Sequence, residues 1–104
     1  MRYTINNLKN ENAVTLIEGM PAGVSELHLE QNRLGNLETQ TLTHMLSVIP
    51  DTVKSLYLDE NGLAAKSIDD LTQIVTAIPS HVEWLSIKEP SFLSAAQNLS
   101  LIHI

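Results

Sequence analysis

The chain has 104 residues, 43% of them hydrophobic, and it contains no cysteine. This composition predicts one domain over residues 1–104 with a real hydrophobic core, and it excludes disulfides, thiolate metal sites and cysteine nucleophiles. The formal net charge of −6 argues against nucleic acid as a partner, because an acidic surface repels phosphate backbones.

A repeat organises the chain, because Pro21, Pro50 and Pro79 stand 29 residues apart and each opens the same run of apolar spacings. Repeating units of this size bury their apolar faces against one another, and the end units are atypical. The period divides the chain into a partial unit at 1–20, complete units at 21–49 and 50–78, and a degenerate unit at 79–104.

Residues 1–20 match mainly the second half of the later units, so we predict a unit that lacks its opening half and acts as an N-terminal cap. We expect the cap to be a helix with Leu8 and Leu16 turned inward. The apolar positions that match the later units are Ile5, Ala13, Leu16, Ile17 and Met20.

The two complete units open with the same pattern of valine, two leucines one residue apart, asparagine and a further leucine. The alternation around Leu27-His28-Leu29 and Leu56-Tyr57-Leu58 predicts short strands with the leucines on one face. Each asparagine can satisfy backbone groups in a buried turn, because an amide carries both donors and acceptors. The matched positions are Val24, Leu27, Leu29, Asn32 and Leu34, and then Val53, Leu56, Leu58, Asn61 and Leu63.

The second half of each complete unit has helical spacing, and the proline of the next unit ends the helix. The first helix is predicted over about residues 38–48. Ser67 is a candidate N-cap for the second, and Asp69 and Asp70 lie near the positive end of its dipole. The apolar positions are Leu42, Met45, Leu46 and Ile49, and then Leu71, Ile74, Val75 and Ile78.

In the last unit, Val82, Leu85 and Ile87 keep their places, but Pro90 stands where the asparagines stood and Phe92 replaces the final leucine. We expect residues 91–104 to form a C-terminal cap. Residues 99–104 fit a strand as well as a helix, and one helical face of the segment would carry Phe92, Ala95, Ala96, Leu99 and Ile102.

The spacing VxxLxLxxNxL resembles the leucine-rich repeat, and a 29-residue unit with a helical second half is similar to the ribonuclease-inhibitor-like class. The Ile-Pro-x-x-Val openings at 49–53 and 78–82 are similar to repeats in leucine-rich-repeat effectors of intracellular bacterial pathogens. The resemblance implies an α/β solenoid, a short right-handed arc with a parallel concave sheet and convex helices. The arc follows because strands lie about 4.8 Å apart whereas helices are about 10 Å thick.

The residues between the strand leucines are predicted to project from the concave sheet and form the candidate partner-binding face. Tyr57 and Trp84 are residue types enriched at binding hot spots, which favours binding; the alternative is that they cover the sheet and protect its hydrogen bonds. The predicted rows across the strands are Glu26, Ser55 and Trp84; His28, Tyr57 and Ser86; and Glu30, Asp59 and Lys88.

The sequence gives little support for metal binding or catalysis. No two histidines are spaced as i,i+4 on one predicted helix, which argues against a metal site, and His44 is expected to face solvent. The acids Glu26, Glu30, Asp59 and Glu60 are better explained as a solvated acidic face than as catalytic carboxylates, because an open sheet gives no desolvated pocket. We therefore predict no cofactor, no metal and no enzymatic activity.

The sequence predicts a protein-protein interaction module whose acidic, aromatic concave face suits a basic protein or peptide. The resemblance implies a bacterial effector that acts on a host protein. The alternative is a structural module that self-associates through the apolar residues Leu99, Leu101, Ile102 and Ile104, although we favour a monomer. With no apolar stretch near 18 residues and no Sec leader, we expect no membrane partner and a location in the cytoplasm, or in a host cell reached by another secretion route.

Overall fold

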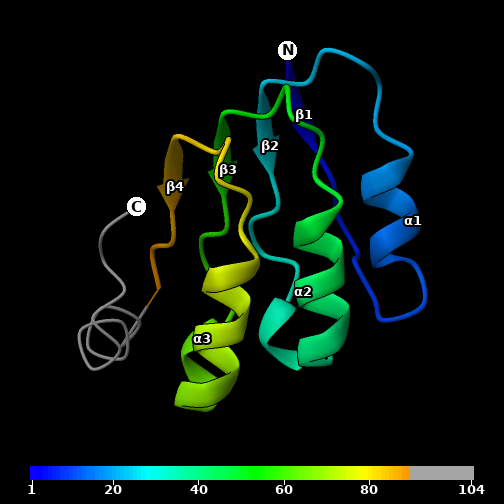
Figure 1. Cartoon of the computed structure of the whole chain (residues 1–104). Coiled ribbons are helices and arrows are strands. Elements are labelled where there is room, and N and C mark those ends of the chain that lie inside the picture. Colours follow the sequence, from blue (N-terminus) through cyan, green and yellow to red (C-terminus); the bar gives the residue numbers. More distant parts are fainter. Residues whose placement is uncertain (90–104) are drawn as a thin grey trace.

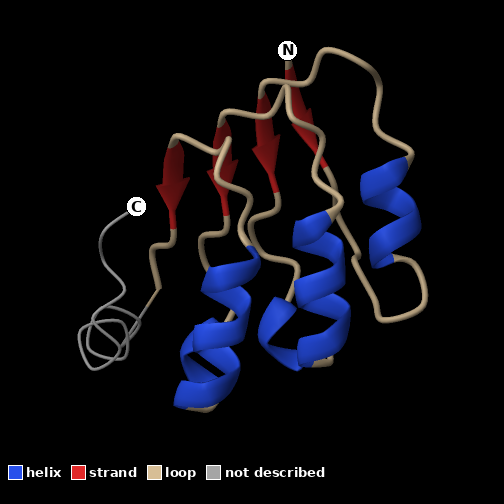
Figure 2. Ribbon diagram, in the orientation of Figure 1, coloured by secondary structure: helices blue, strands red, loops and turns tan. Residues whose placement is uncertain are grey.

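The computed structural model describes residues 1–89 of the chain. In this part, four short strands form one parallel sheet in the order β1-β2-β3-β4, and the helices pack on one side of it (Figures 1 and 2). The strands are β1 (Arg2–Thr4), β2 (Glu26–His28), β3 (Ser55–Tyr57) and β4 (Trp84–Ser86). The helices are α1 (Ala13–Glu18), α2 (Thr39–Ser47) and α3 (Ile68–Ala77), and two 3₁₀ turns are η1 (Leu34–Asn36) and η2 (Leu63–Ala65).

The strand leucines point into the core, as the period-2 alternation predicts. Leu27 and Leu56 are fully buried, and they stand opposite one another in the sheet, with Leu85 next in the same row. Neighbouring units therefore stack leucine on leucine between the sheet and the helices. The predicted apolar positions Val82, Leu85 and Ile87 of the last unit also pack on this core.

The N-terminal region differs from the prediction, because the first unit does have an opening strand. Tyr3 of β1 pairs with Leu27 of β2, and Ile5 is buried two residues later. The paired strand residues of these two units are 24 residues apart, whereas the matching apolar positions of their helices, such as Ile17 and Leu46, keep the spacing of 29. The matching helix positions thus follow the strand five residues earlier in the first unit than in the second, which hides β1 from a search at fixed period.

The prediction that Leu16 turns inward was wrong. Leu16 lies on α1 and is 38% exposed, whereas Met45 at the matching position of α2 is fully buried. Helix α2 contacts both α1 and α3, while α1 has a neighbouring helix on one side only among residues 1–89. Leu8 is buried as predicted, but it lies in the loop before α1 and not on a helix.

The two asparagines form a continuous ladder through the turns that follow the strands. The amide nitrogen Nδ2 of Asn32 donates to the carbonyl oxygens of Ile5 (2.8 Å) and Leu29 (2.9 Å), and its Oδ1 accepts from the backbone N–H of Leu8 (3.1 Å). Asn61 repeats the pattern one unit later, and its Oδ1 accepts from the backbone N–H of Asn32 at 2.7 Å. The predicted role of both residues is confirmed.

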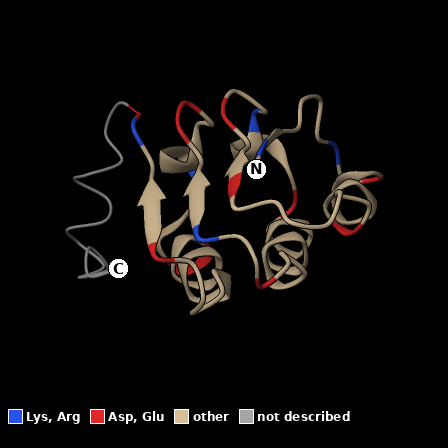
Figure 3. Ribbon diagram, turned by 90° about the horizontal axis from the view of Figure 1, so that it is seen from above, with Lys and Arg blue, Asp and Glu red and all other residues tan. Residues whose placement is uncertain are grey.

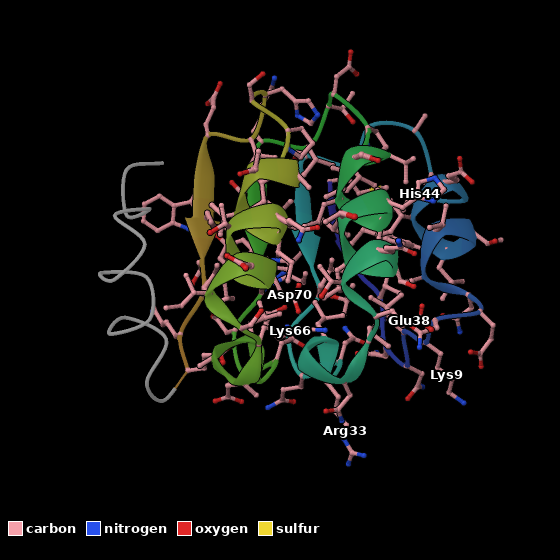
Figure 4. All side chains as sticks on the ribbon, turned by 60° about the horizontal axis from the view of Figure 1, so that its bottom comes forward. Lys9, Arg33, Glu38, His44, Lys66 and Asp70 are labelled. Atoms are coloured by element: carbon pink, nitrogen blue, oxygen red, sulfur yellow. The ribbon has the colours of Figure 1, made fainter. Side chains whose placement is uncertain are left out.

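The helix ends also agree closely with those predicted from the sequence. Helix α2 begins after Glu38 and ends before Val48, and the hydroxyl of Ser67 accepts a hydrogen bond from the backbone N–H of Asp70 at the start of α3. Figure 4 shows Lys66 close to the start of α3, where its ammonium group donates to the carbonyl oxygen of Leu37 in the preceding unit. The predicted C-terminal cap and the positions of Pro90 and Phe92 lie outside the described residues.

Candidate partner-binding face

The candidate face is the side of the sheet opposite the helices, and the register of the strands gives the predicted rows. Glu26 stands beside Ser55, which stands beside Trp84, and in the next row His28 stands beside Tyr57, followed by Ser86. We use the name concave face for the side chains of these rows and of the positions two residues beyond them, which are Glu30, Asp59 and Lys88.

Exposure divides the nine predicted site residues into three groups. Trp84, at 57% exposed, and Lys88 are open to solvent. His28 and Ser86 are buried although they lie on this face, so they form its floor and are not freely available to a partner. The remaining residues are half-buried, namely Glu26, Glu30, Ser55, Tyr57 and Asp59.

Strand β1 adds side chains that the sequence analysis did not assign to this face. Arg2 stands beside Glu26 and Thr4 beside His28, and both are exposed. The signal that could have found them is the apolar pair Tyr3 and Ile5, which has the same two-residue spacing as Leu27 and Leu29.

A stacked pair of rings occupies the centre of the face. The rings of His28 and Tyr57 are parallel within 5°, with their centroids 4.2 Å apart. Arg2 Nε donates to His28 Nε2 at 3.1 Å, so Nε2 is the acceptor and the ring proton lies on Nδ1. That proton faces the carboxylate of Glu30, 3.0 Å away. The His28 ring is therefore held between a cation and an anion.

A second group of contacts ties β4 to the loop after β3. One carboxylate oxygen of Asp59 accepts from the hydroxyl of Ser86 and from the backbone N–H of Lys88, each at 2.8 Å. Both Glu30 and Asp59 are thus engaged within the chain. Within residues 1–89, the carboxylate of Glu26 makes no hydrogen bond and no ion pair.

Acidic residues dominate the inner strands of the face. The concave-face acids Glu26, Glu30 and Asp59 all belong to the units of β2 and β3, and the basic residues Arg2 and Lys88 belong to the outer strands. Figure 3 shows the acidic segments in the loops that follow the inner strands. A positively charged partner would meet attraction at the centre of the sheet.

Two other histidines, His44 and His81, lie within the described residues. His44 lies on the helical side of the molecule (Figure 4) and is exposed, as predicted. Both ring nitrogens of His81 face backbone carbonyl oxygens of earlier units, Val53 at 3.0 Å and Ile49 at 3.3 Å. Across residues 1–89, no group of three or more metal-binding side chains gathers, and none of the helices there is long and apolar enough to cross a membrane.

Comparison with solved structures finds a close likeness over most of the chain. The crystal structure of the leucine-rich repeat-containing protein LegL7 from Legionella pneumophila matches 91% of this chain with a TM-score of 0.82 and 35% sequence identity. The match covers 29% of the LegL7 chain, so our chain spans less than a third of that protein. No protein-family model and no curated protein matches the chain.

The structural likeness agrees with the repeat seen in the residues. Both the leucines stacked across β2, β3 and β4 and the ladder of buried asparagines occur at the positions where the repeat spacing places them. On this evidence the chain is a leucine-rich repeat protein, folded as an α/β solenoid.

Proposed function

We propose that this chain is a protein-interaction module that binds a basic protein or peptide through its concave face. The observation that carries the proposal is Trp84, a large aromatic side chain that is more than half exposed beside the acidic inner strands. An exposed indole fills no core, and tryptophan is among the residues that contribute most to protein interfaces. The proposed role is binding and not catalysis.

The face also has the rigidity that favours tight binding. Tyr57 is held by its stack on His28, and the side chains around it are fixed by bonds that cross the strands. A surface that is already ordered loses little conformational entropy when a partner docks. The alternative role of Tyr57, covering the sheet, is compatible with binding, because a stacked ring can cover the sheet and also contact a partner.

We further propose that the partner is a host-cell protein and that the chain acts as a bacterial effector. Two observations support this proposal: the Ile-Pro-x-x-Val openings at 49–53 and 78–82, and the likeness to a protein from Legionella pneumophila.

The test is capture of the partner from host-cell lysate with the wild-type chain and with a Tyr57→Ala, Trp84→Ala double variant. We expect the double variant to lose capture while it remains folded by circular dichroism, because it removes both aromatic side chains of the face. The matched control is Gln73→Ala, Thr76→Ala, which changes two exposed residues of α3 on the opposite side. Equal capture by the double variant and the control would place the binding site elsewhere.

The second candidate function is self-association through the apolar residues at 99–104, which lie outside the described residues. Light scattering coupled to size exclusion at tens of micromolar separates the two candidates. A monomer argues against self-association, and a dimer that persists in the Tyr57→Ala, Trp84→Ala variant argues for it.

A further inference from the structure

The concave face offers one carboxylate that the chain itself leaves unused. Glu30 is bonded to His28, and Asp59 is bonded to Ser86 and to the backbone of Lys88. Glu26 is half-buried, and its carboxylate has no partner within residues 1–89. A partly desolvated acid without a partner gains most from a cation supplied from outside.

The residues beside Glu26 determine what shape of cation fits there. Across the sheet, Glu26 is followed by Ser55 and then by Trp84. Because parallel strands lie about 4.8 Å apart, the backbones of Glu26 and Trp84 are about 10 Å apart. Ser55 between them has a short side chain, so the row leaves a gap above Ser55 between the acid and the exposed indole.

We propose that this gap, which we call the Glu26–Trp84 subsite, binds an arginine side chain of the partner. A guanidinium group is planar, so it can donate two hydrogen bonds to the Glu26 carboxylate and stack on the Trp84 indole at the same time. The proposal rests on the proposed function and adds to it the chemical group that the face recognises.

The neighbouring charges are compatible with an arginine at this point. Arg2 lies on the far side of Glu26, and its Nε is already directed to His28. Lys88 lies two residues after Ser86, at the β4 edge of the sheet, and is therefore two rows away from Ser55. The groups that border the gap are therefore one negative charge, Glu26, and one aromatic ring, Trp84.

The experiment is a titration followed by NMR on the indole N–H of Trp84, which gives a single signal because the chain has one tryptophan. The probe is the peptide acetyl-Gly-Arg-Gly-amide, and the control peptide carries uncharged citrulline in place of arginine. We expect the arginine peptide to shift the indole signal in a saturable manner and the citrulline peptide to leave it in place.

Glu26→Gln should weaken binding of the arginine peptide by about fivefold, which is the upper end of the range for a surface ion pair. The matched control is Glu83→Gln, which removes the same charge from an exposed residue directly before Trp84 but outside the row. A second variant, Ser55→Tyr, fills the gap without changing the charge and should abolish the shift. The proposal is wrong if the citrulline peptide acts like the arginine peptide, or if Glu83→Gln weakens binding as much as Glu26→Gln.

The outcome is separable from that of the proposed function, because the titration needs no partner protein. If Glu26→Gln captures the partner as well as wild type while the Tyr57→Ala, Trp84→Ala variant does not, the face binds its partner without the arginine contact. If the titration behaves as expected and the double variant still captures the partner, the gap recognises arginine but the captured partner docks elsewhere, and the proposed contact with that partner is wrong.

Discussion

Asn32 and Asn61 show how many buried backbone groups a single side-chain amide can satisfy in this fold. Each is almost fully buried, and each connects its own turn to the unit before it through both halves of the amide. An alanine at either position leaves backbone donors and acceptors buried without partners, and those groups cannot reach water.

We expect Asn61→Ala to lower the free energy of unfolding by about 1–3 kcal/mol, the usual range for buried polar groups left without a partner. Urea denaturation followed by circular dichroism measures the loss. Gln31→Ala is the control, since the Gln31 side chain is exposed and bonds only to exposed Glu60, and it should change stability very little. Equal losses in the two variants would contradict the role of the ladder.

The sequence predicts which side chains occupy the concave face, because alternation along a strand assigns each residue to one side. It does not predict how far each is exposed. His28 is buried because Arg2, Glu30 and Tyr57 surround it, and two of these three come from other strands. Their arrangement depends on the register of β1, which the fixed period conceals.

At the scale of elements, the turns after the strands hold the units at a fixed separation. Gln31 and Glu60 both have positive φ angles, 58° and 57°, and so do Arg33 and Gly62 two residues later. The repeated left-handed residues bend each chain segment from the sheet toward its helix. Gly35 then lies against the backbone of the next unit, where its amide donates to the carbonyl oxygen of Asn61 at 2.8 Å.

Gly35→Ala should destabilise the chain by about 1–3 kcal/mol through overpacking. A Cβ atom at position 35 would lie 2.2 Å from the carbonyl oxygen of Gly62, and that neighbour is backbone and cannot rotate away. Thermal unfolding by circular dichroism reports the effect.

The matched control for Gly35→Ala is Ala64→Gly, at the equivalent position of the next unit, where the sequence already tolerates a methyl group. Its cost should stay below about 1 kcal/mol, the typical penalty for glycine in a helical segment. If Gly35→Ala is as harmless as the control, the close approach of η1 and η2 is not a constraint.

The elements themselves could be predicted where the repeat is regular. The strands β2, β3 and β4 and the helices α2 and α3 follow from apolar spacing, and α3 even from its cap residue. The first unit could not be predicted in the same way, because its shortened connection shifts the strand relative to the helix. Leu16 shows a further limit, since its exposure follows from α1 having a neighbouring helix on one side only among residues 1–89, and not from its own spacing.

For the whole molecule, the net charge of −6 should affect how partners are found. Attraction between an acidic face and a basic partner accelerates association, and salt screens it. We expect partner affinity to fall when the salt concentration rises from about 0.1 M to about 1 M, as the screening length falls from about 10 Å to about 3 Å. Surface plasmon resonance should show the change mainly in the association rate.

An affinity that is insensitive to salt would indicate an apolar contact that Trp84 dominates. The Glu26→Gln variant provides an internal comparison, because removing a charge from the face should reduce the salt dependence while Glu83→Gln reduces it less.

The start of the chain forms part of the concave face, and this affects how the protein should be handled in the laboratory. The amino group of Met1 bonds to the hydroxyl of Ser25 at 2.9 Å, directly before β2, and Arg2 supports the histidine under Tyr57. An affinity tag fused directly ahead of β1 would crowd the side of the sheet on which Arg2 and Thr4 lie. Trimming residues 1–4 would leave one side of the ring stack open. Binding assays should therefore keep residues 1–4 intact and place any tag away from β1.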